Sequence, residues 1–118
     1  MKRILISQRI DYFPKRNEIR DALDINLSNV IINLGYIPIP VSNAFGNLKK
    51  NKLIKYINSL DPHGIILSGG NNLNEYKNRD FLEKTLIEFA IKNKKPLLGI
   101  CRGMQIIGNY FGVDIENV

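Results

Sequence analysis

The chain has 118 residues, the length of one small domain, and its composition, 44% hydrophobic and 24% charged, is typical of a globular protein. The 17 basic and 11 acidic side chains give a net charge of +6, much of it in two lysine-rich runs at residues 49–52 and 92–95. No aromatic residues interleave with these lysines and no recognition-helix pattern is present. We therefore expect solvated lysines near helix ends and no nucleic-acid partner.

The apolar segments are short and cysteine is rare. No window is long and apolar enough for a membrane helix, and the apolar stretch after Met1 is too short for a signal peptide. A single cysteine, Cys101, cannot form an internal disulfide, so we expect a cytoplasmic protein without a membrane partner. One cysteine and one histidine cannot build a metal site, and no dinucleotide or P-loop glycine pattern occurs. We expect no metal and no cofactor.

Strand-like and helix-like segments alternate along the first half of the chain. Residues 3–8 are short, β-branched and apolar, which predicts a buried strand. Apolar residues then recur at three- and four-residue spacing, which predicts an amphipathic helix over residues 18–34 that stops at Gly35. Residues 36–41 are extended, and their two prolines favour a place at the edge of a sheet. A second, basic helix is predicted up to Leu60.

The second half continues the alternation. Residues 64–68 predict a third strand, and the polar loop 71–78 leads to a third helix. The apolar face of this helix consists of Leu82, Leu86, Phe89 and Ala90. Residues 96–100 predict a fourth strand and residues 104–111 a fourth helix. This order indicates an α/β fold of the three-layer flavodoxin-like type, a parallel sheet with helices on both faces. Ligands bind such sheets beyond the carboxyl ends of the strands.

The only cysteine lies in the sequence Gly99-Ile100-Cys101-Arg102-Gly103, between the fourth strand and the fourth helix. A sharp strand-to-helix turn strains its pivot residue and requires small neighbours, because the helix and strand backbones approach closely. The pivot side chain is exposed, and the helix N-terminus favours a thiolate. The pattern predicts that Cys101 is a nucleophile. A small buried thiol, with glycines that serve only packing, is the alternative.

A second glycine-marked loop, Ser68-Gly69-Gly70-Asn71, follows the third strand. Gly-Gly after a strand can be a simple turn, but in this topology its backbone amides face the same crevice as Cys101. The amides of Gly70 and Arg102 are therefore candidates to hold the oxyanion of a tetrahedral intermediate. The two loops together predict acyl transfer.

Four further residues near the crevice are candidate substrate contacts. Gln105 lies one helical turn beyond Cys101 and projects from the same face of the helix. Gly69 leaves the approach to the thiol open. Arg9 follows the first strand and could contact an anionic substrate, with an ordinary surface arginine as the alternative. Asn71 could hydrogen-bond the substrate or serve only as a turn residue.

Two further expectations concern the contacts of the Arg102 side chain and the position of His63, the one histidine of the chain. We expect the Arg102 side chain to pair with a carboxylate of another element and thereby fix the turn at Cys101. His63 immediately precedes the third strand, so we expect it at the amino end of the sheet, opposite the crevice. It is therefore not a candidate general base for Cys101.

The two glycine loops carry a resemblance to a known family. Ser68-Gly69-Gly70-Asn71, followed by Pro96-Leu97-Leu98-Gly99-Ile100-Cys101-Arg102-Gly103-Met104-Gln105, resembles the class I glutamine amidotransferase superfamily. The Cys-Arg-Gly-x-Gln form and residues 20–24 are similar to its γ-glutamyl hydrolase-like branch, including hydrolases of γ-glutamyl nucleotide phosphoramidates in capsule synthesis. The resemblance implies Cys101 as nucleophile, backbone oxyanion donors at Gly70 and Arg102, and a glutamyl contact at Gln105.

The resemblance covers the whole chain but only the N-terminal part of the family domain. We therefore expect residues 1–118 to be the N-terminal portion of a single glutamine amidotransferase-like domain. A catalytic pair spaced His-x-Glu is implied beyond Val118, and the chain by itself is expected to be inactive.

The leading hypothesis is hydrolysis of a γ-glutamyl amide or glutamine by Cys101 through a γ-glutamyl thioester. The sequence does not determine whether the group released from the γ-carbonyl is ammonia, an amine or a phosphoramidate nucleotide. There are two alternative functions: an amidotransferase subunit that delivers ammonia to a partner synthetase, and a non-catalytic flavodoxin-like binding module. The sequence also leaves open whether the protein forms a homodimer. A stress-related cysteine hydrolase of similar architecture is disfavoured by Arg102 and by the Gly-Gly loop.

Overall fold

The computed structural model describes residues 1–113, so the end of the expected domain, residues 114–118, lies outside the described part. Within it, parallel strands form one sheet in the order β4-β1-β5-β6. These strands are β1 (Arg3–Ile6), β4 (Ile37–Pro40), β5 (Gly64–Leu67) and β6 (Leu97–Gly99). The α-helices are α1 (Ile25–Asn33), α2 (Lys50–Leu60), α3 (Lys77–Lys92) and α4 (Arg102–Tyr110).

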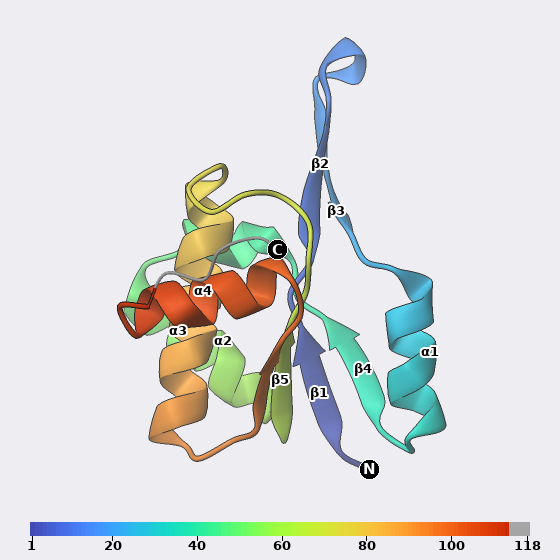
Figure 1. Cartoon of the computed structure of the whole chain (residues 1–118), viewed down its shortest axis with the longest axis vertical. Helices are drawn as coiled ribbons and strands as arrows, with labels where there is room; N and C mark the ends of the chain where they lie inside the picture. The colour runs from blue at the N-terminus through green and yellow to red at the C-terminus, as the bar shows by residue number, and fades with distance from the viewer. Residues whose placement is uncertain (114–118) are drawn as a thin grey trace.

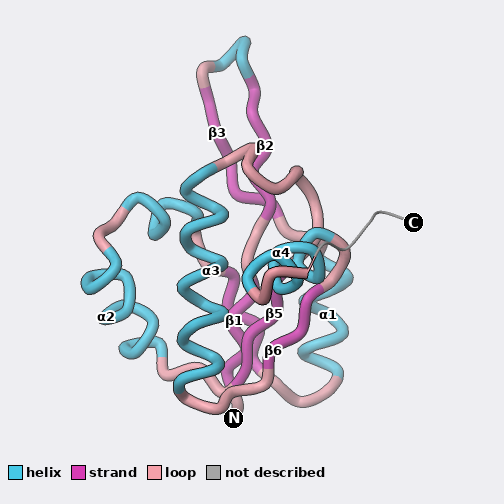
Figure 2. The backbone as a smooth tube through the Cα atoms, turned by 60° about the vertical axis from the view of Figure 1, so that its left-hand side comes forward, coloured by secondary structure: helices cyan, strands magenta, loops and turns pink. Residues whose placement is uncertain are grey.

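The helices form a layer on each face of the sheet. Helix α1 lies on one side, and α2, α3 and α4 lie on the other (Figures 1 and 2). The predicted three-layer α/β architecture is therefore confirmed. The described residues contain no helix that is both long and apolar enough to span a membrane.

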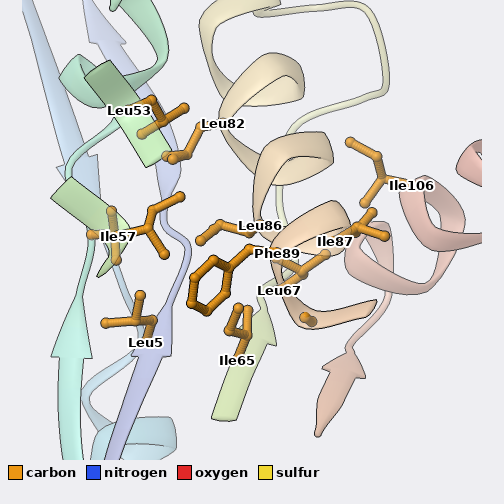
Figure 3. Close-up of a cluster of buried hydrophobic side chains, with 12 residues drawn as sticks. Leu5, Leu53, Ile57, Ile65, Leu67, Leu82, Leu86, Ile87, Phe89 and Ile106 are labelled. Carbon is orange, nitrogen blue, oxygen red and sulfur yellow. The ribbon is translucent and has the colours of Figure 1, made fainter. Parts of the chain in front are cut away.

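Alternate residues of the central strands pack into the two layers. Leu5, Ile65 and Leu67 point to the side of α2, α3 and α4, where they join the larger hydrophobic cluster (Figure 3). Its helical members include Leu53, Ile57, Leu82, Leu86, Ile87, Phe89, Ala90 and Ile106. The smaller cluster faces α1 and consists of Ile6, Ile31 and Ile66. All four residues of β5 are buried, as expected of an inner strand of a parallel sheet.

The edge position predicted for the proline-containing strand is confirmed. Strand β4 pairs only with β1 in the sheet, in a register that joins Arg3 to Ile37 and Ile6 to Pro40. An edge strand tolerates proline because one side of its backbone has no strand partner to receive an N–H group.

The helix predicted over residues 18–34 is wrong in its first part. Residues Glu18–Ala22 form strand β3, which pairs antiparallel with β2 (Arg9–Phe13). The 3-10 turn η1 (Pro14–Arg16) connects them, and the resulting hairpin projects beyond the carboxyl end of the sheet (Figure 1). Helix α1 begins only at Ile25, where the Asp24 carboxylate caps its N-terminus by accepting from the backbone N–H of Asn26.

Hydrogen bonds at the base of the hairpin explain the difference. The Asp21 carboxylate accepts from the Ser42 hydroxyl at 2.8 Å and from the backbone and side-chain N–H groups of Asn43 at 3.1 and 2.8 Å. These bonds tie β3 to the 3-10 turn η2 (Asn43–Asn47) that follows β4. The helical spacing began at Ile19, but this side chain is 65% exposed in the hairpin. Long-range partners thus override a short apolar periodicity.

Candidate active site

Three loops meet at the carboxyl end of the sheet: the one after β1 that enters the hairpin, the one after β5, and the turn between β6 and α4 (Figure 1). Cys101 is the pivot of the last turn. Its backbone has φ 51° and ψ −108°, it is the residue that precedes α4, and it is exposed. A positive φ in a cysteine is strained and persists only where the surroundings impose it. The predicted strand–cysteine–helix pivot is therefore present.

The glycines on both sides of Cys101 are required by close backbone approach. A Cβ atom added to Gly99 would lie 2.5 Å from the carbonyl carbon of Gly103. A Cβ atom added to Gly103 would lie 2.1 Å from the carbonyl oxygen of Leu67 in β5. The Gly-x-Cys-x-Gly spacing thus lets the first turn of α4 sit directly against the end of the sheet.

The glycine loop after β5 lies beside the cysteine. A Cβ atom at Gly69 would be 3.4 Å from the Cβ of Cys101, so the two loops lie side by side with no side chain between them. Gly70 has φ +87°, and a Cβ atom there would be 2.9 Å from the Cβ of Arg9. Arg9 therefore lies against Gly70, with a half-exposed side chain whose Nε pairs with the Asp11 carboxylate at 2.8 Å.

A buried arginine that the sequence analysis did not single out holds this loop. Arg79 of α3 has no exposed side-chain surface. Its Nη2 donates to the carbonyl oxygens of Ser68 at 2.9 Å and Gly69 at 3.2 Å. Its Nη1 donates to the carbonyl oxygen of Gly70 at 2.5 Å and to Oδ1 of Asn71 at 2.9 Å. Four consecutive residues of the loop thus bind one guanidinium group.

Glu83, one turn further along α3, connects Arg79 to the turn at Cys101. Its Oε2 accepts from Arg79 at 3.4 Å and from the hydroxyl of Ser7 at 2.5 Å. Its Oε1 pairs with the guanidinium of Arg102, which also pairs with Asp80. The expected pairing of Arg102 with a carboxylate of another element is confirmed. Burial lowers the pKa of Arg79, and the neighbouring Glu83 carboxylate opposes that shift.

A signal for this network was present in the sequence. Arg79 lies three residues before Leu82 and seven before Leu86. Glu83 lies one residue after Leu82 and three before Leu86. At these spacings both charged residues share the apolar face of the helix. Charged side chains on an apolar helix face are buried only when they are paired. The interruption of that face by an arginine and a glutamate at i and i+4 therefore indicates a buried ion pair.

The remaining candidate residues lie around the same crevice. Gln105 is in the first turn of α4, and its backbone N–H donates to the carbonyl oxygen of Cys101 at 3.2 Å. The side chain of Asn71 accepts from the backbone N–H of Ile10 at 2.8 Å and donates to its carbonyl at 2.9 Å, so it joins the loop to the hairpin. A hollow of about 460 Å³ adjoins the crevice. It is lined by Arg9, Ser68, Gly69 and Ile100 and by residues at the start of α1.

His63 lies at the opposite end of the sheet, as predicted. Its Nδ1 accepts from the backbone N–H of Arg3 at 3.0 Å, and its own backbone N–H donates to the carbonyl of Arg3 at 2.9 Å. Desolvation, followed by the positive charge of Arg3, lowers the pKa of His63. The histidine thus bridges the amino ends of β1 and β5 and does not reach Cys101.

A cysteine pivot beside a glycine loop at the carboxyl edge of a parallel sheet defines a class of proteins. The family described as glutamine amidotransferase class-I matches residues 19–117, and the chain belongs to it. Among curated proteins, the chain is 36% identical to gamma-glutamyl-CDP-amidate hydrolase of Campylobacter jejuni, over 94% of this chain and 56% of that protein. The resemblance noted from the two glycine loops is thereby confirmed.

Two relatives carry names of synthase components. The chain is 36% identical to a glutamine-hydrolyzing GMP synthase subunit of Methanococcus aeolicus, over 65% of this chain and 33% of that protein. It is 32% identical to anthranilate synthase component 2 of Saccharolobus solfataricus, over 81% of this chain and 46% of that protein. The chain thus spans about half, or less, of the length of these relatives.

Proposed function

We propose that the protein that contains this chain hydrolyses a γ-glutamyl amide, with Cys101 as nucleophile. The observation that carries the proposal is the strained, exposed conformation of Cys101 at the start of α4, in contact with the Gly69–Gly70 loop. Homologues that act as amide hydrolases and glutamine amidotransferases support the reaction class.

The reaction proceeds in two steps. The sulfur of Cys101 attacks the γ-carbonyl carbon, and the backbone amides of Gly70 and Arg102 stabilise the oxyanion that forms. The C–N bond then breaks, the amine leaves with a proton, and a γ-glutamyl thioester remains. Water adds to the thioester, which releases glutamate and returns the thiol.

Substrate contacts are assigned to four residues around the thiol: Gly69, Asn71, Arg9 and Gln105. Gly69 lies against Cys101 without a side chain that would block the carbonyl. Arg9 offers a half-exposed guanidinium beside Gly70, which suits a carboxylate or phosphate group of the substrate. The adjoining hollow of about 460 Å³ is large enough for part of a leaving group. A γ-glutamyl phosphoramidate nucleotide of capsule synthesis fits this arrangement, and the single cysteine suits a cytoplasmic enzyme.

We propose that the general base comes from outside these 118 residues. The one histidine of the chain, His63, lies at the amino end of the sheet, and amide hydrolysis requires a base and an acid for the leaving amine. We infer that residues 1–118 are the nucleophile-bearing portion of a single domain whose His-x-Glu pair lies elsewhere. The 118-residue chain alone is therefore expected to show no turnover.

A second candidate function is ammonia delivery to a synthetase partner. The relatives named as an anthranilate synthase component and a GMP synthase subunit favour it. Such a subunit would cleave free glutamine and would be stimulated by its partner, whereas the hydrolase would need neither. A binding module without chemistry would have no use for a strained cysteine, and no feature of the described crevice favours a homodimer over a synthetase partner.

Covalent labelling tests the proposal. A chloromethyl ketone analogue of glutamine should attach to Cys101, with chloride leaving, and peptide mass spectrometry should find the adduct on that residue. The Cys101→Ala variant should take up none. Labelling at the same rate as a free thiol in solution would contradict an active-site role. Full amide turnover by the Cys101→Ala variant of the complete protein would remove the nucleophile assignment.

A further inference from the structure

One buried carboxylate joins the two loops that meet at Cys101. Glu83 has no exposed side-chain surface, and its two oxygens are divided between the loops. Oε1 pairs with Arg102 at the start of α4, and Oε2 accepts from Arg79, which holds the loop after β5. The two expected oxyanion donors, the amides of Gly70 and Arg102, are therefore connected through the side chains of Arg79, Glu83 and Arg102, with Glu83 in the middle.

The hydrogen bonds of Arg79 determine the direction of the glycine amides. In a planar trans peptide the C=O and N–H groups point in opposite directions. The carbonyl of Gly69 accepts from Arg79 at 3.2 Å, so the N–H of Gly70 in the same peptide points away from the buried guanidinium. The carbonyl of Ser68 accepts at 2.9 Å, which fixes the N–H of Gly69 in the same way. The amides therefore face the open side of the loop.

Glycine loops are flexible and need such a constraint. Each glycine can adopt more backbone conformations than other residues, so Gly69-Gly70 alone would sample many orientations of its amides. Oxyanion stabilisation requires donors held at about 2.7–3.1 Å from the reacting oxygen before the reaction begins. A guanidinium that binds three successive carbonyls supplies this restraint.

The stability of the folded chain is a weak reason for burying the charged network of Arg79, Glu83 and Arg102. Burying charged groups costs free energy that their mutual attraction repays only partly, and apolar residues of similar size often stabilise a core as well or better. Arg79, Glu83 and Arg102 are each at most 3% exposed and fill space next to the hydrophobic cluster. Arg79 donates to the carbonyl groups of the loop after β5, and Glu83 pairs with Arg102 of the turn at Cys101.

We propose that Arg79 and Glu83 are positioning residues of the oxyanion hole. Arg79 orients the peptides of the loop after β5, and Glu83 couples this loop to Arg102 so that the two amide donors keep a fixed separation. This inference rests on the proposed function of Cys101 as nucleophile.

Two reagents that alkylate the same thiol separate positioning from general integrity. A chloromethyl ketone analogue of glutamine reacts through a tetrahedral adduct whose oxyanion needs the amide donors. Iodoacetamide forms the S–C bond by direct displacement of iodide and develops no oxyanion. The measured quantity is the ratio of the two rate constants for Cys101, each taken at the plateau of its pH–rate profile, where the thiol is fully ionised.

Glu83→Gln and Arg79→Lys are the test variants. Each should lower the chloromethyl ketone rate by at least about tenfold, since the loss of one oxyanion donor costs about 10²–10³ in rate. The iodoacetamide rate should change by less than about twofold. Glu88→Gln is the matched control, because Glu88 lies on the same helix but pairs with Lys50 at the surface. Its rate ratio should equal that of the wild type.

Three outcomes are distinguishable. A wild-type ratio no higher than that of N-acetylcysteine contradicts the proposed function itself, and the inference with it. A raised wild-type ratio that persists in folded Glu83→Gln and Arg79→Lys overturns only the positioning role. If either variant does not fold by circular dichroism, Ser7→Ala decides: it keeps every charge and removes the two hydrogen bonds of the Ser7 hydroxyl, one donated to Glu83 and one accepted from the backbone N–H of Ser68 in the loop after β5. A ratio lowered in Ser7→Ala supports the inference, and an unchanged ratio overturns it.

Discussion

The two glycine-marked loops that meet at Cys101 are held by different means. The turn between β6 and α4 is packed backbone against backbone, because Gly99, Gly103 and the end of β5 are too close for any Cβ atom, and the pairing of Arg102 with Glu83 and Asp80 adds to this support. The loop after β5 is fixed by a side chain, the guanidinium of Arg79, which comes from a helix further along the chain. Backbone packing is visible in the sequence of the loop itself as glycine spacing, whereas the support from Arg79 is marked only in the sequence of α3.

The largest effect is expected from Gly103→Ala, which breaks the backbone-held turn. The new Cβ atom would overlap the carbonyl oxygen of Leu67 at 2.1 Å, and neither backbone can move without displacing α4 from the sheet. We expect the free energy of unfolding, measured by urea denaturation, to fall by about 3 kcal/mol or more. Gly64→Ala is the control, since its Cβ would lie 3.1 Å from the end of the flexible Ile4 side chain and at an ordinary contact distance of 3.7 Å from the carbonyl oxygen of Pro96. Equal losses in the two variants would contradict the close-packing explanation.

A smaller effect is expected from Gly70→Ala in the side-chain-held loop. A positive φ costs an alanine about 1–2 kcal/mol, and the overlap with Arg9 adds to it. Gly35→Ala measures the cost of the positive φ alone, because Gly35 has φ +85° and no atom lies within 4 Å of an added Cβ. In an Arg9→Gly background, which removes the Arg9 Cβ atom that would lie 2.9 Å from the added Cβ, Gly70→Ala should lower the free energy of unfolding only as much as Gly35→Ala does. A loss as large as in the wild-type background would show that Arg9 does not press on this loop.

These two loops also mark how far the sequence predicts the site. The strand–Cys–helix pivot, the Gly-Gly loop beside it and the pairing of Arg102 could all be predicted, because short motifs and strand ends define them. The partners of that pairing could not be assigned, since Glu83 and Asp80 come from α3 and reach Arg102 only in the folded chain. The presence of Arg79 and Glu83 on an apolar helix face was a usable but indirect signal.

The hairpin shows the same limit at the level of the fold. The parallel sheet, its helices and the edge strand follow from periodicity and proline positions. Strands β2 and β3 were missed because the residues that stabilise them, Ser42 and Asn43, lie about twenty positions downstream of Asp21 and define no local pattern. Asp24, which caps α1, was the one local sign that the helix starts later than residue 18.

Asp21→Asn should weaken the base of the hairpin and, through Asn71 and Ile10, the side-chain-held loop that it contacts. It converts a carboxylate that accepts from Ser42 and Asn43 into an amide that matches these donors poorly. Loss of a charge-assisted hydrogen bond lowers the free energy of unfolding by about 1–2 kcal/mol. Glu18→Gln in the same strand is the control, because its partner Arg20 is an exposed neighbour whose ion pair contributes little. A larger loss in the control would exclude Asp21 as the main anchor.

The smallest effect is expected at the amino end of the sheet, away from both loops. The pKa of His63 is lowered from its ordinary value of 6.5, first by desolvation and then by the charge of Arg3. Below about pH 6.5 the unfolded chain therefore binds a proton at His63 that the folded chain does not, so the free energy of unfolding decreases as the pH falls through this range. Above that range both states are neutral, and the contribution is constant.

The variant His63→Asn tests this linkage while it keeps an acceptor near the backbone N–H of Arg3. The informative quantity is the difference between the wild-type and variant free energies of unfolding, measured by urea denaturation between about pH 5 and pH 8. We expect this difference to be flat above about pH 6.5 and to shift in favour of the variant as the pH falls. Labelling of Cys101 should be the same in both proteins at every pH, because His63 lies at the other end of the sheet. A change in labelling that follows the titration of His63 would mean that the two ends of the sheet are coupled, which would contradict a role of His63 confined to the amino end.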